Sequence, residues 1–305
     1  MNRLRVYAQL VRLPNVFTAL ADICLGWLAV LYTGTPPARW PTFVLLLFAS
    51  ACLYCGGMVW NDFFDLEQDK RERPFRPLPS GRISRRSAAL FGAILLIAGL
   101  VFAWLAGWSK AVGKGTSDTT PVLLAGLLVL AILLYDGWLK RTWAGPVGMG
   151  TCRFLNVLLG LSAADRLEWW GVHLALVVGV YIGGVTWFAR TEARTSNQTA
   201  LRGAAGVMLS SLVLALILPV RFDPGTSSVL FPYLLVVLGF LVGIPVWNAI
   251  NWPTPVHVQG AVKWAILGLV VLDAVLATAL AGPSGLVILV LLLPALYLGQ
   301  WIYST

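Results

Sequence analysis

Charged residues are scarce in this sequence, and negative charge is the scarcer sign. Of the 305 residues only 11% are charged, with 13 Asp and Glu against 22 Lys and Arg. Soluble globular domains typically carry about 25% charged residues. The stretches between the apolar runs are also too short to form a soluble domain of useful size. These shortages exclude an ordinary soluble enzyme.

Cysteine and histidine are also rare, with four Cys and two His in the chain. Cys24, Cys52, Cys55 and Cys152 all lie in apolar stretches, so no disulfide framework is indicated. Cys52 and Cys55 have the C-x-x-C spacing of redox and zinc sites, but neither a second such pair nor a histidine cluster accompanies them. We therefore interpret the cysteines as small buried residues of packed helices.

Long hydrophobic runs dominate what remains. The chain is 58% hydrophobic with a mean hydropathy of +0.80, and its apolar runs of about 17 to 25 residues match the length that a helix needs to cross a bilayer. The sequence predicts a single integral-membrane domain over residues 1–305, an all-α bundle of nine or ten transmembrane spans. These spans are about 13–31, 41–59, 87–107, 121–137, 145–163, 169–189, 204–220, 229–247, 261–281 and 285–302. An alternative for the last two is one span followed by a re-entrant hairpin.

Positive charge alternates between the predicted loops. Sixteen Lys and Arg fall on the side that holds the N-terminus and five on the other, while Arg153 lies inside a span. By the positive-inside rule, the N-terminus and its side face the cytoplasm, most simply at the cell (inner) membrane. This placement accounts for the net charge of +9, and we expect no nucleic acid partner. A signal peptide is the competing interpretation of the first run, but Asp22 interrupts that run and the alternation requires the helix to remain.

One stretch gathers much of the negative charge. Five of the 13 acidic residues fall between Asp62 and Glu72, after the second predicted span. If residues 61–69 are helical, Asp62, Asp65 and Asp69 stand at i, i+3 and i+7 and point along one stripe. Carboxylates so placed repel one another unless a cation lies among them, and Mg²⁺ takes oxygen ligands of this kind together with phosphates.

Arginines follow the acidic stretch directly. Arg73 and Arg76 lie just downstream of Asp69, and guanidinium groups donate bidentate, charge-assisted hydrogen bonds to phosphate. Carboxylates, a divalent metal and arginines together predict a diphosphate site on the cytoplasmic side. The alternative is a solvated charged loop between two membrane helices, although spaced aspartates on one stripe are a poor design for solubility.

Polar residues also interrupt two later spans. Arg153 and Asn156 stand at i and i+3 in the fifth span and so share a face. An arginine within a span normally faces a wet cavity or an anionic partner; the alternative is that Arg153 snorkels to the interface from near the helix start. Asp273 in the ninth span either faces the cavity or pairs with another polar group.

These motifs resemble the UbiA superfamily of intramembrane prenyltransferases. Asn61-Asp62-x-x-Asp65-x-x-x-Asp69 is similar to the first Asp-rich motif of that family and lies in the expected place. The resemblance covers about residues 10–205. It continues in Arg12-Leu13-Pro14-Asn15, in Arg73-Pro74-x-Arg76-Pro77, in Tyr135…Lys140-Arg141 and in Gly150-x-x-Arg153-x-x-Asn156. Between Tyr135 and Lys140 there is one residue more than the family pattern has.

The resemblance implies a fold, a cofactor and roles for particular residues. The fold would be nine transmembrane helices around a central cavity that opens laterally to lipid. Mg²⁺ held by Asp62, Asp65 and Asp69 would bind an isoprenyl diphosphate, while Arg73, Arg76 and Lys140 neutralise the phosphates. Catalytic roles fall to the three aspartates and Lys140. Further substrate-binding residues would be Asn15, Asn61, Tyr135, Arg153, Asn156, Glu192 and Asn197, with Glu192 as an additional metal ligand.

The second Asp-rich motif departs from the family pattern. The family has two aspartates about four residues apart after the sixth span, whereas this chain reads Thr191-Glu192-Ala193-Arg194-Thr195-Ser196-Asn197. Glu192 would replace the first aspartate, and Ser196 or Asn197 the second, so two carboxylates become one. Arg190 and Arg194 are candidates for binding phosphate directly. In this respect the chain resembles a divergent EboC-like subgroup.

The sequence therefore supports two functions from different classes. The first is Mg²⁺-dependent transfer of an isoprenyl group from its diphosphate to a lipophilic acceptor in the bilayer. The alternative is non-catalytic binding or transport of a polyprenyl diphosphate or related anionic lipid. The intact first motif favours catalysis, and the reduced second motif favours binding alone. A secondary transporter is a more distant alternative, because its polar site would lie near the midplane.

Overall fold

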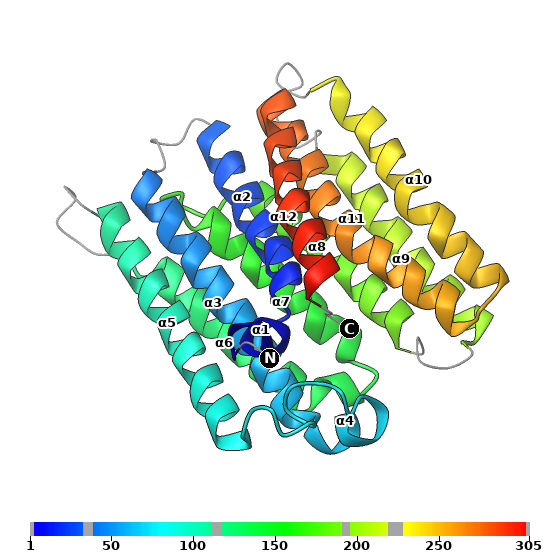
Figure 1. Cartoon of the computed structure of the whole chain (residues 1–305). Coiled ribbons are helices and arrows are strands. Elements are labelled where there is room, and N and C mark those ends of the chain that lie inside the picture. The colour runs from blue at the N-terminus through cyan, green and yellow to red at the C-terminus, as the bar shows by residue number, and fades with distance from the viewer. Residues whose placement is uncertain (1–2, 33–38, 112–117, 191–195, 219–227, 303–305) are drawn as a thin grey trace.

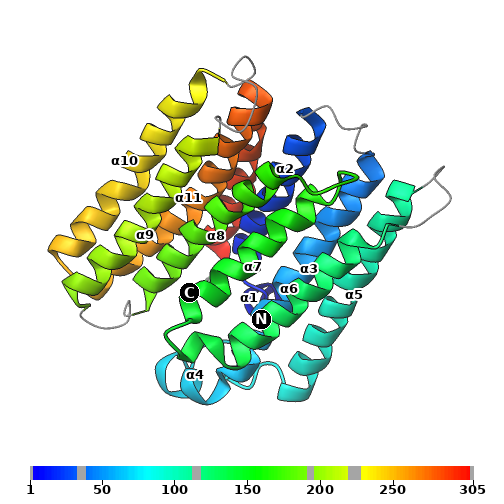
Figure 2. The same ribbon diagram turned by 180° about the vertical axis from the view of Figure 1, so that it is seen from behind.

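The computed structural model of the chain describes residues 3–32, 39–111, 118–190, 196–218 and 228–302, and within these ranges it is helical without strands (Figures 1 and 2). This confirms the all-α prediction. The helices run α1 Arg3–Leu10, η1 Leu13–Asn15, α2 Val16–Tyr32, α3 Trp40–Phe64, α4 Leu66–Glu72, α5 Arg85–Ala111, α6 Thr120–Gly137, η2 Leu139–Arg141, α7 Gly145–Leu161, α8 Trp169–Ala189, α9 Gln198–Ile217, α10 Leu230–Asn251, α11 Pro255–Ala281, η4 Gly282–Leu291 and α12 Leu292–Trp301.

Proline marks where several long helices begin. A proline occupies the first or second position of α3, α6, α7 and α11. The proline ring fixes a helical φ, and the missing N–H is one that the first turn leaves without an intrahelical partner. Proline also limits a helix at its end: after α4, the prolines at 74, 77 and 79 prevent that helix from continuing.

Eight segments in the described part of the chain are long and apolar enough to cross a bilayer. They include α2, α3, α5, α6, α8, α9 and α10, with α11 to α12 counted together as Pro255–Trp301. Helix α7 has 17 residues and falls outside this count. The chain reverses at Gly282, where φ is 60°, and η4 packs back against α11. The total of nine or ten spans stays a prediction.

Contacts between helix ends and short connecting segments mark the two ends of the bundle. At one end, the Arg5 guanidinium donates to the Trp301 carbonyl and the Arg141 guanidinium to the Phe64 carbonyl. At the other end, Lys110 donates to Asp118 and to the carbonyls of Ser162 and Ala164. Helices α1 and α4 both lie toward this first end (Figure 1). The N-terminal segment, the junction of α3 with α4 and the turn after α6 therefore lie at one end of the bundle.

Helices α2 and α7 approach each other backbone to backbone. A Cβ atom added at Gly26 would lie 2.6 Å from the carbonyl carbon of Gly160, and one added at Gly160 would lie 2.9 Å from the Ile23 Cα. Only glycine permits so close a contact. It fixes the deeper part of α2 against α7, which places their polar residues face to face within the bundle.

Candidate functional site

The acidic motif lies where α3 passes into α4. The amide of Asp65 donates to the Asn61 carbonyl at 3.0 Å, and the amide of Asp69 donates to the Asp65 carbonyl at 2.8 Å. The i to i+4 pattern therefore continues across Asp65, although its ψ of 4° marks a local break between the two helices. Asp62 and Asp69 are buried, whereas Asp65 is half-buried.

Arg76 binds two of the three aspartates with one nitrogen. Its Nη1 lies 2.7 Å from Asp69 Oδ2 and 3.4 Å from Asp62 Oδ1. The side chain is only 6% exposed, and its second nitrogen, Nη2, is buried with no hydrogen-bond partner among the described residues. A buried guanidinium nitrogen without an acceptor is costly. The geometry leaves that nitrogen available to an incoming anion.

Burial shifts the pKa of both partners in this ion pair. It raises the pKa of the Asp69 carboxyl above its usual value, although Arg76 opposes the shift. It lowers the pKa of the Arg76 guanidinium, and the nearby positive charge of Arg12 adds to that effect. Both shifts show that burial disfavours the charged form of these side chains, which therefore depend on their ion pair to stay charged.

Arg12 supplies a second cation from the N-terminal segment. Its Nη2 donates to Asp62 Oδ1 at 3.0 Å and lies 3.4 Å from Asn61 Oδ1. The Arg12 backbone has a φ of 50°, the only positive φ of a non-glycine residue in the described chain. Such strain persists only where surrounding contacts determine it. Asn15 follows in η1, and its side chain lies within hydrogen-bonding reach of the Tyr54 hydroxyl.

The turn after α6 contacts the third aspartate. Lys140 Nζ lies 2.7 Å from Asp65 Oδ2 and 3.8 Å from Asp136 Oδ1. The Asn61 side-chain amide donates to Asp136 at 2.7 Å, which joins α3 to α6 at this level. Tyr135 packs toward α7, because a Cβ at Gly148 would lie 3.1 Å from its ring.

The carboxylates of the site are candidate ligands for Mg²⁺. Within the described residues, no group of three or more Asp, Glu, His or Cys side chains gathers closely enough to hold a metal ion. Asp62 and Asp69, however, converge on a single cationic nitrogen of Arg76, while Asp65 turns to Lys140. Mg²⁺ prefers oxygen ligands, among them carboxylate oxygens that converge on one place. The donor chemistry fits, with Asp62 and Asp69 as the pair already brought together.

The second predicted motif is described only at its edges. Arg190, at the end of α8, donates to the Thr142 carbonyl, so this loop begins beside the segment that carries Lys140. Asn197 caps α9, because its side chain accepts from the Thr199 amide at 2.8 Å. Glu192 lies outside the described residues. Arg73 is half-buried at the end of α4, three residues before Arg76.

Arg153 and Asn156 converge on one partner deeper in the bundle. Arg153 donates to Asp22 Oδ2 at 3.1 Å and to the Thr18 hydroxyl at 2.8 Å, and the Asn156 amide donates to Asp22 Oδ2 at 2.8 Å. The two residues share a face, as their spacing predicts. Their anionic partner is a residue of α2, and the guanidinium lies 5.6 Å from the Tyr54 ring centroid.

Sequence reasoning gave no site role to several of these residues. Asp136 is buried beside Asn61 and Lys140, and its signal was the polar run that ends the fourth predicted span. Arg12 belongs to a motif in the sequence, but nothing in its spacing indicates a bond to Asp62. In the sequence, Asp22 is only an interruption of an apolar run.

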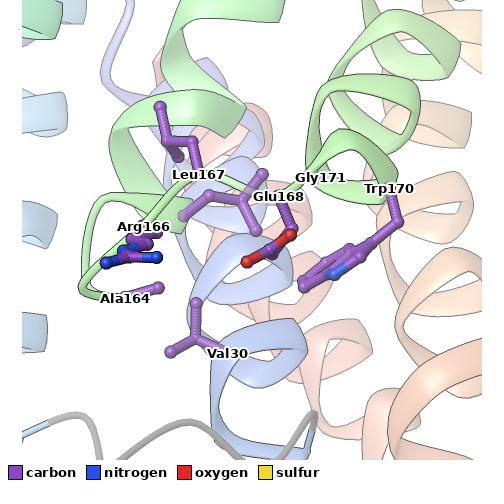
Figure 3. A pocket seen from close by; sticks show the side chains of 8 residues that line it. Val30, Ala164, Arg166, Leu167, Glu168, Trp170 and Gly171 are labelled. Atoms are coloured by element: carbon purple, nitrogen blue, oxygen red, sulfur yellow. The ribbon is translucent and has the colours of Figure 1, made fainter.

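A small pocket opens at the opposite end of the bundle (Figure 3). It lies where α7 passes into α8, between Val30 of α2 and the segment around Arg166 and Glu168. Figure 3 shows mainly apolar side chains around it, with Trp170 beside Glu168. Because the acidic motif lies at the far end, this pocket is separate from the site.

Comparison with known proteins decides the family. The model of the UbiA prenyltransferase family matches residues 23–262. The chain belongs to the UbiA prenyltransferase family. Among curated relatives, it is 36% identical over 179 residues to digeranylgeranylglyceryl phosphate synthase of Sulfolobus acidocaldarius, covering 58% of this chain and 56% of the relative. It is 32% identical over 180 residues to that of Methanococcoides burtonii, covering 54% and 58%. The chain thus spans about half the length of these relatives.

Solved structures show the UbiA fold. A digeranylgeranylglyceryl phosphate synthase structure superposes with a TM-score of 0.66 at 21% identity, covering 92% of this chain and 99% of the other. A UbiA homologue from Archaeoglobus fulgidus, bound to GPP and Mg²⁺, superposes with a TM-score of 0.62 at 15% identity, covering 87% and 99%. Family and apolar helices together make the chain an integral membrane protein.

Proposed function

We propose that this UbiA-family protein transfers an isoprenyl group from an isoprenyl diphosphate to a lipophilic acceptor within the membrane, with Mg²⁺ as cofactor. The observation that carries the proposal is the buried, unpartnered Nη2 of Arg76 beside two converging carboxylates. A structural cation would normally have all its donors satisfied. This one retains a donor suited to a phosphate oxygen.

Each side chain has a part in the proposed site. Asp62 and Asp69, with Asp65, would hold Mg²⁺, which neutralises diphosphate charge and so makes the diphosphate a better leaving group. Arg76 presents Nη2 to a phosphate oxygen. If Asp65 helps to hold the metal, the Lys140 ammonium, which now pairs with Asp65, would be free to bind the leaving diphosphate. Arg73 adds positive charge from the same loop.

The surrounding helices protect the reaction. Loss of diphosphate leaves an allylic cation, which water would capture if it were present. Arg12, Arg76 and Asp62 join separate parts of the chain at the site, and the apolar spans beyond them would keep water away from the prenyl group. The acceptor then forms its bond to the allylic carbon and gives up a proton.

The acceptor class comes from the curated relatives. They are named digeranylgeranylglyceryl phosphate synthases, and we infer from these names that the first acceptor to test is a prenylated glycerol phosphate lipid. The phosphate of such a lipid would require positive charge at the membrane surface. Arg141 is exposed and lies 3.7 Å from Asp65, so it is placed at the rim of the site.

We propose that the site faces the cytoplasm at the cell membrane. The support is the excess of Lys and Arg in the loops at that end of the bundle. The diphosphate would then be taken from the side on which phosphorylated metabolites are made. A cysteine placed at Arg71 should react with an impermeant maleimide only in inside-out vesicles; reaction in right-side-out vesicles would contradict this orientation.

A transfer assay tests the function. Detergent-solubilised protein is incubated with radiolabelled isoprenyl diphosphates of several lengths, a prenylated glycerol phosphate or a membrane extract, and Mg²⁺ or EDTA. The expected result is a lipophilic product that requires Mg²⁺ and disappears in Asp62→Asn. Glu67→Gln is the matched control, because Glu67 lies in the same segment but its side chain is exposed and forms an ion pair with the exposed Lys70.

Two other outcomes would contradict the transferase. Mg²⁺-dependent retention of label without product, lost in Asp62→Asn, would instead support binding or transport of the diphosphate. Neither retention nor product with any substrate would refute the diphosphate site. An equal loss of activity in Glu67→Gln would show that the effect is not specific to the site.

A further inference from the structure

A second polar cluster lies inside the bundle, away from the acidic motif. It joins Asp22 of α2, Arg153 and Asn156 of α7, and Asp273 of α11. Both carboxyl side chains are fully buried, and they lie within hydrogen-bonding reach of each other. Residues so far from water must satisfy their polar atoms within the protein.

The cluster has more acceptors than donors. Asp22 Oδ2 accepts from Arg153 and Asn156, but Asp22 Oδ1 and both oxygens of Asp273 have no donor among the described residues. Three buried carboxylate oxygens without donors are costly. The nearby hydroxyl of Tyr181 does not supply a donor, because it donates to the Ala265 carbonyl at 2.8 Å.

The charges of the cluster do not balance either. Two ionised carboxylates face one guanidinium, since Arg153 is the only cation in contact with the pair in the described structure. Like-charged carboxyl groups in contact and out of water do not both ionise. One added proton makes the cluster neutral and supplies a hydrogen bond between Asp22 Oδ1 and one of the two unpartnered Asp273 oxygens.

We propose that Asp22 and Asp273 form a proton-binding pair that holds one proton between them, and that Asp273 is thereby a positioning residue for Arg153. The proton bridges an Asp273 oxygen and the free oxygen of Asp22. Asp22 then keeps one full negative charge for Arg153 and Asn156. No covalent step is involved, and the proton comes from solvent during folding.

The space around the pair favours a proton over a larger ligand. Asp22 lies one turn from the close contact of Gly26 with Gly160, where added atoms would meet backbone at 2.6 Å. On the far side, Asp273 shares α11 with residues that are almost entirely buried, among them Leu272 and Ala274. A molecule with several heavy atoms would have to displace these helices.

The pair connects to the candidate site through Arg153. The guanidinium held by Asp22 lies under the Tyr54 ring, and the Tyr54 hydroxyl reaches Asn15, three residues after Arg12. Asp273 therefore fixes, through Asp22, a side chain that borders the polar lining of the site. It also ties α11 of the C-terminal half to α2 of the N-terminal half.

Infrared spectroscopy of the whole protein in nanodiscs tests the pair directly. A protonated carboxyl group has a C=O stretch separate from that of carboxylates and shifted in D₂O. We expect such a band at neutral pH, lost in Asp273→Asn and in Asp22→Asn but retained in Asp118→Asn, whose carboxylate is ion-paired. Absence of the band in the parent protein, or its persistence in both variants of the pair, would overturn the proposal.

Thermal unfolding of two Asp273 variants supplies the second test. Asp273→Asn offers an amide N–H in place of the shared proton and should unfold within about 2 °C of the parent. Asp273→Leu has similar size but no donor and should unfold about 5 °C or more below it. Equal losses in both variants would show that Asp273 acts through packing alone and would refute the shared proton. Neither measurement requires the proposed transferase activity.

Discussion

Lys140 Nζ lies 2.7 Å from Asp65 Oδ2, so the turn after α6 neutralises an aspartate contributed by the junction of α3 and α4. Both side chains are mostly buried, with exposures of 12% and 17%. In the proposed site, the Lys140 ammonium occupies the place beside Asp65 that a divalent cation would take. The pair would then link metal binding to the position of the lysine.

Replacing the lysine should reveal that link. Lys140→Met leaves Asp65 without its closest cation and should lower the free energy of unfolding by about 1–3 kcal/mol without metal. Added Mg²⁺ should stabilise this variant more than the parent, because the metal replaces the lost charge. Unfolding midpoints with Mg²⁺ or EDTA measure both effects. Lys70→Met, at an exposed pair with Glu67, should change little; equal Mg²⁺ effects in the parent and Lys140→Met would contradict the link.

Arg76 should be irreplaceable by lysine. Arg76→Lys keeps a positive charge for Asp69 but removes the second nitrogen that has no partner. We expect Mg²⁺-dependent binding of an isoprenyl diphosphate to weaken by about tenfold or more, since one charge-assisted hydrogen bond is lost. Equilibrium binding of a labelled diphosphate measures the change. Arg71→Lys, at an exposed position of α4, is the control. Unchanged diphosphate binding by Arg76→Lys would show that Nη2 of Arg76 does not contact the diphosphate.

The opposite end of the bundle should lose stability in acid. Burial alone would raise the pKa of the Asp118 carboxyl, but hydrogen bonds from Lys110 and Thr120 lower it below its usual value. A lowered folded-state pKa stabilises the fold above the unfolded value of about 4, and this contribution is lost as the pH falls through the folded pKa. Asp118→Asn should therefore unfold earlier than the parent at pH 7, with the difference shrinking below about pH 4.

Thermal unfolding between pH 7 and pH 3 measures that trend. The exposed Glu67→Gln should track the parent throughout, since its ion pair with Lys70 lies in water. If the difference in unfolding temperature between Asp118→Asn and the parent grew as the pH fell, the Lys110–Asp118 ion pair would not be its source.

The glycine contact between α2 and α7 should tolerate no side chain. Gly26→Ala places a Cβ against backbone atoms at 2.6 Å and should cost about 1–3 kcal/mol or more, because backbone cannot move aside as a side chain does. Gly206→Ala in α9 is the matched control, since its Cβ meets nothing within 4 Å. The control should be neutral or stabilising, as alanine favours helix. Chemical denaturation compares the two, and equal stability would refute the close contact.

The sequence predicted the fold and the place of the acidic motif because both depend on local patterns. Apolar length predicts spans, and the spacing of Asp62, Asp65 and Asp69 predicts a shared side of one helical segment. The structure adds that Asp65 faces a different cation from the other two. That division depends on where α6 ends in space, which no local pattern contains.

The deeper cluster was less accessible to sequence analysis. Arg153 was expected to face either an anionic partner or the interface, and only the packing of α7 against α2 identifies Asp22 as the partner. Asp273 is 251 positions from Asp22 in the sequence, and the two residues meet only because α11 packs against α2. Contacts at such separations follow from tertiary packing and not from residue spacing.

The contact of Gly26 with Gly160 also constrains how the protein can move. Two helices whose main chains touch cannot slide or part without breaking that contact, so α2 and α7 behave as one mechanical unit. The same two helices carry the ion pair of Asp22 with Arg153. If a long lipid chain enters the bundle, as the proposed function requires, we expect α2 and α7 to stay together while other helices move.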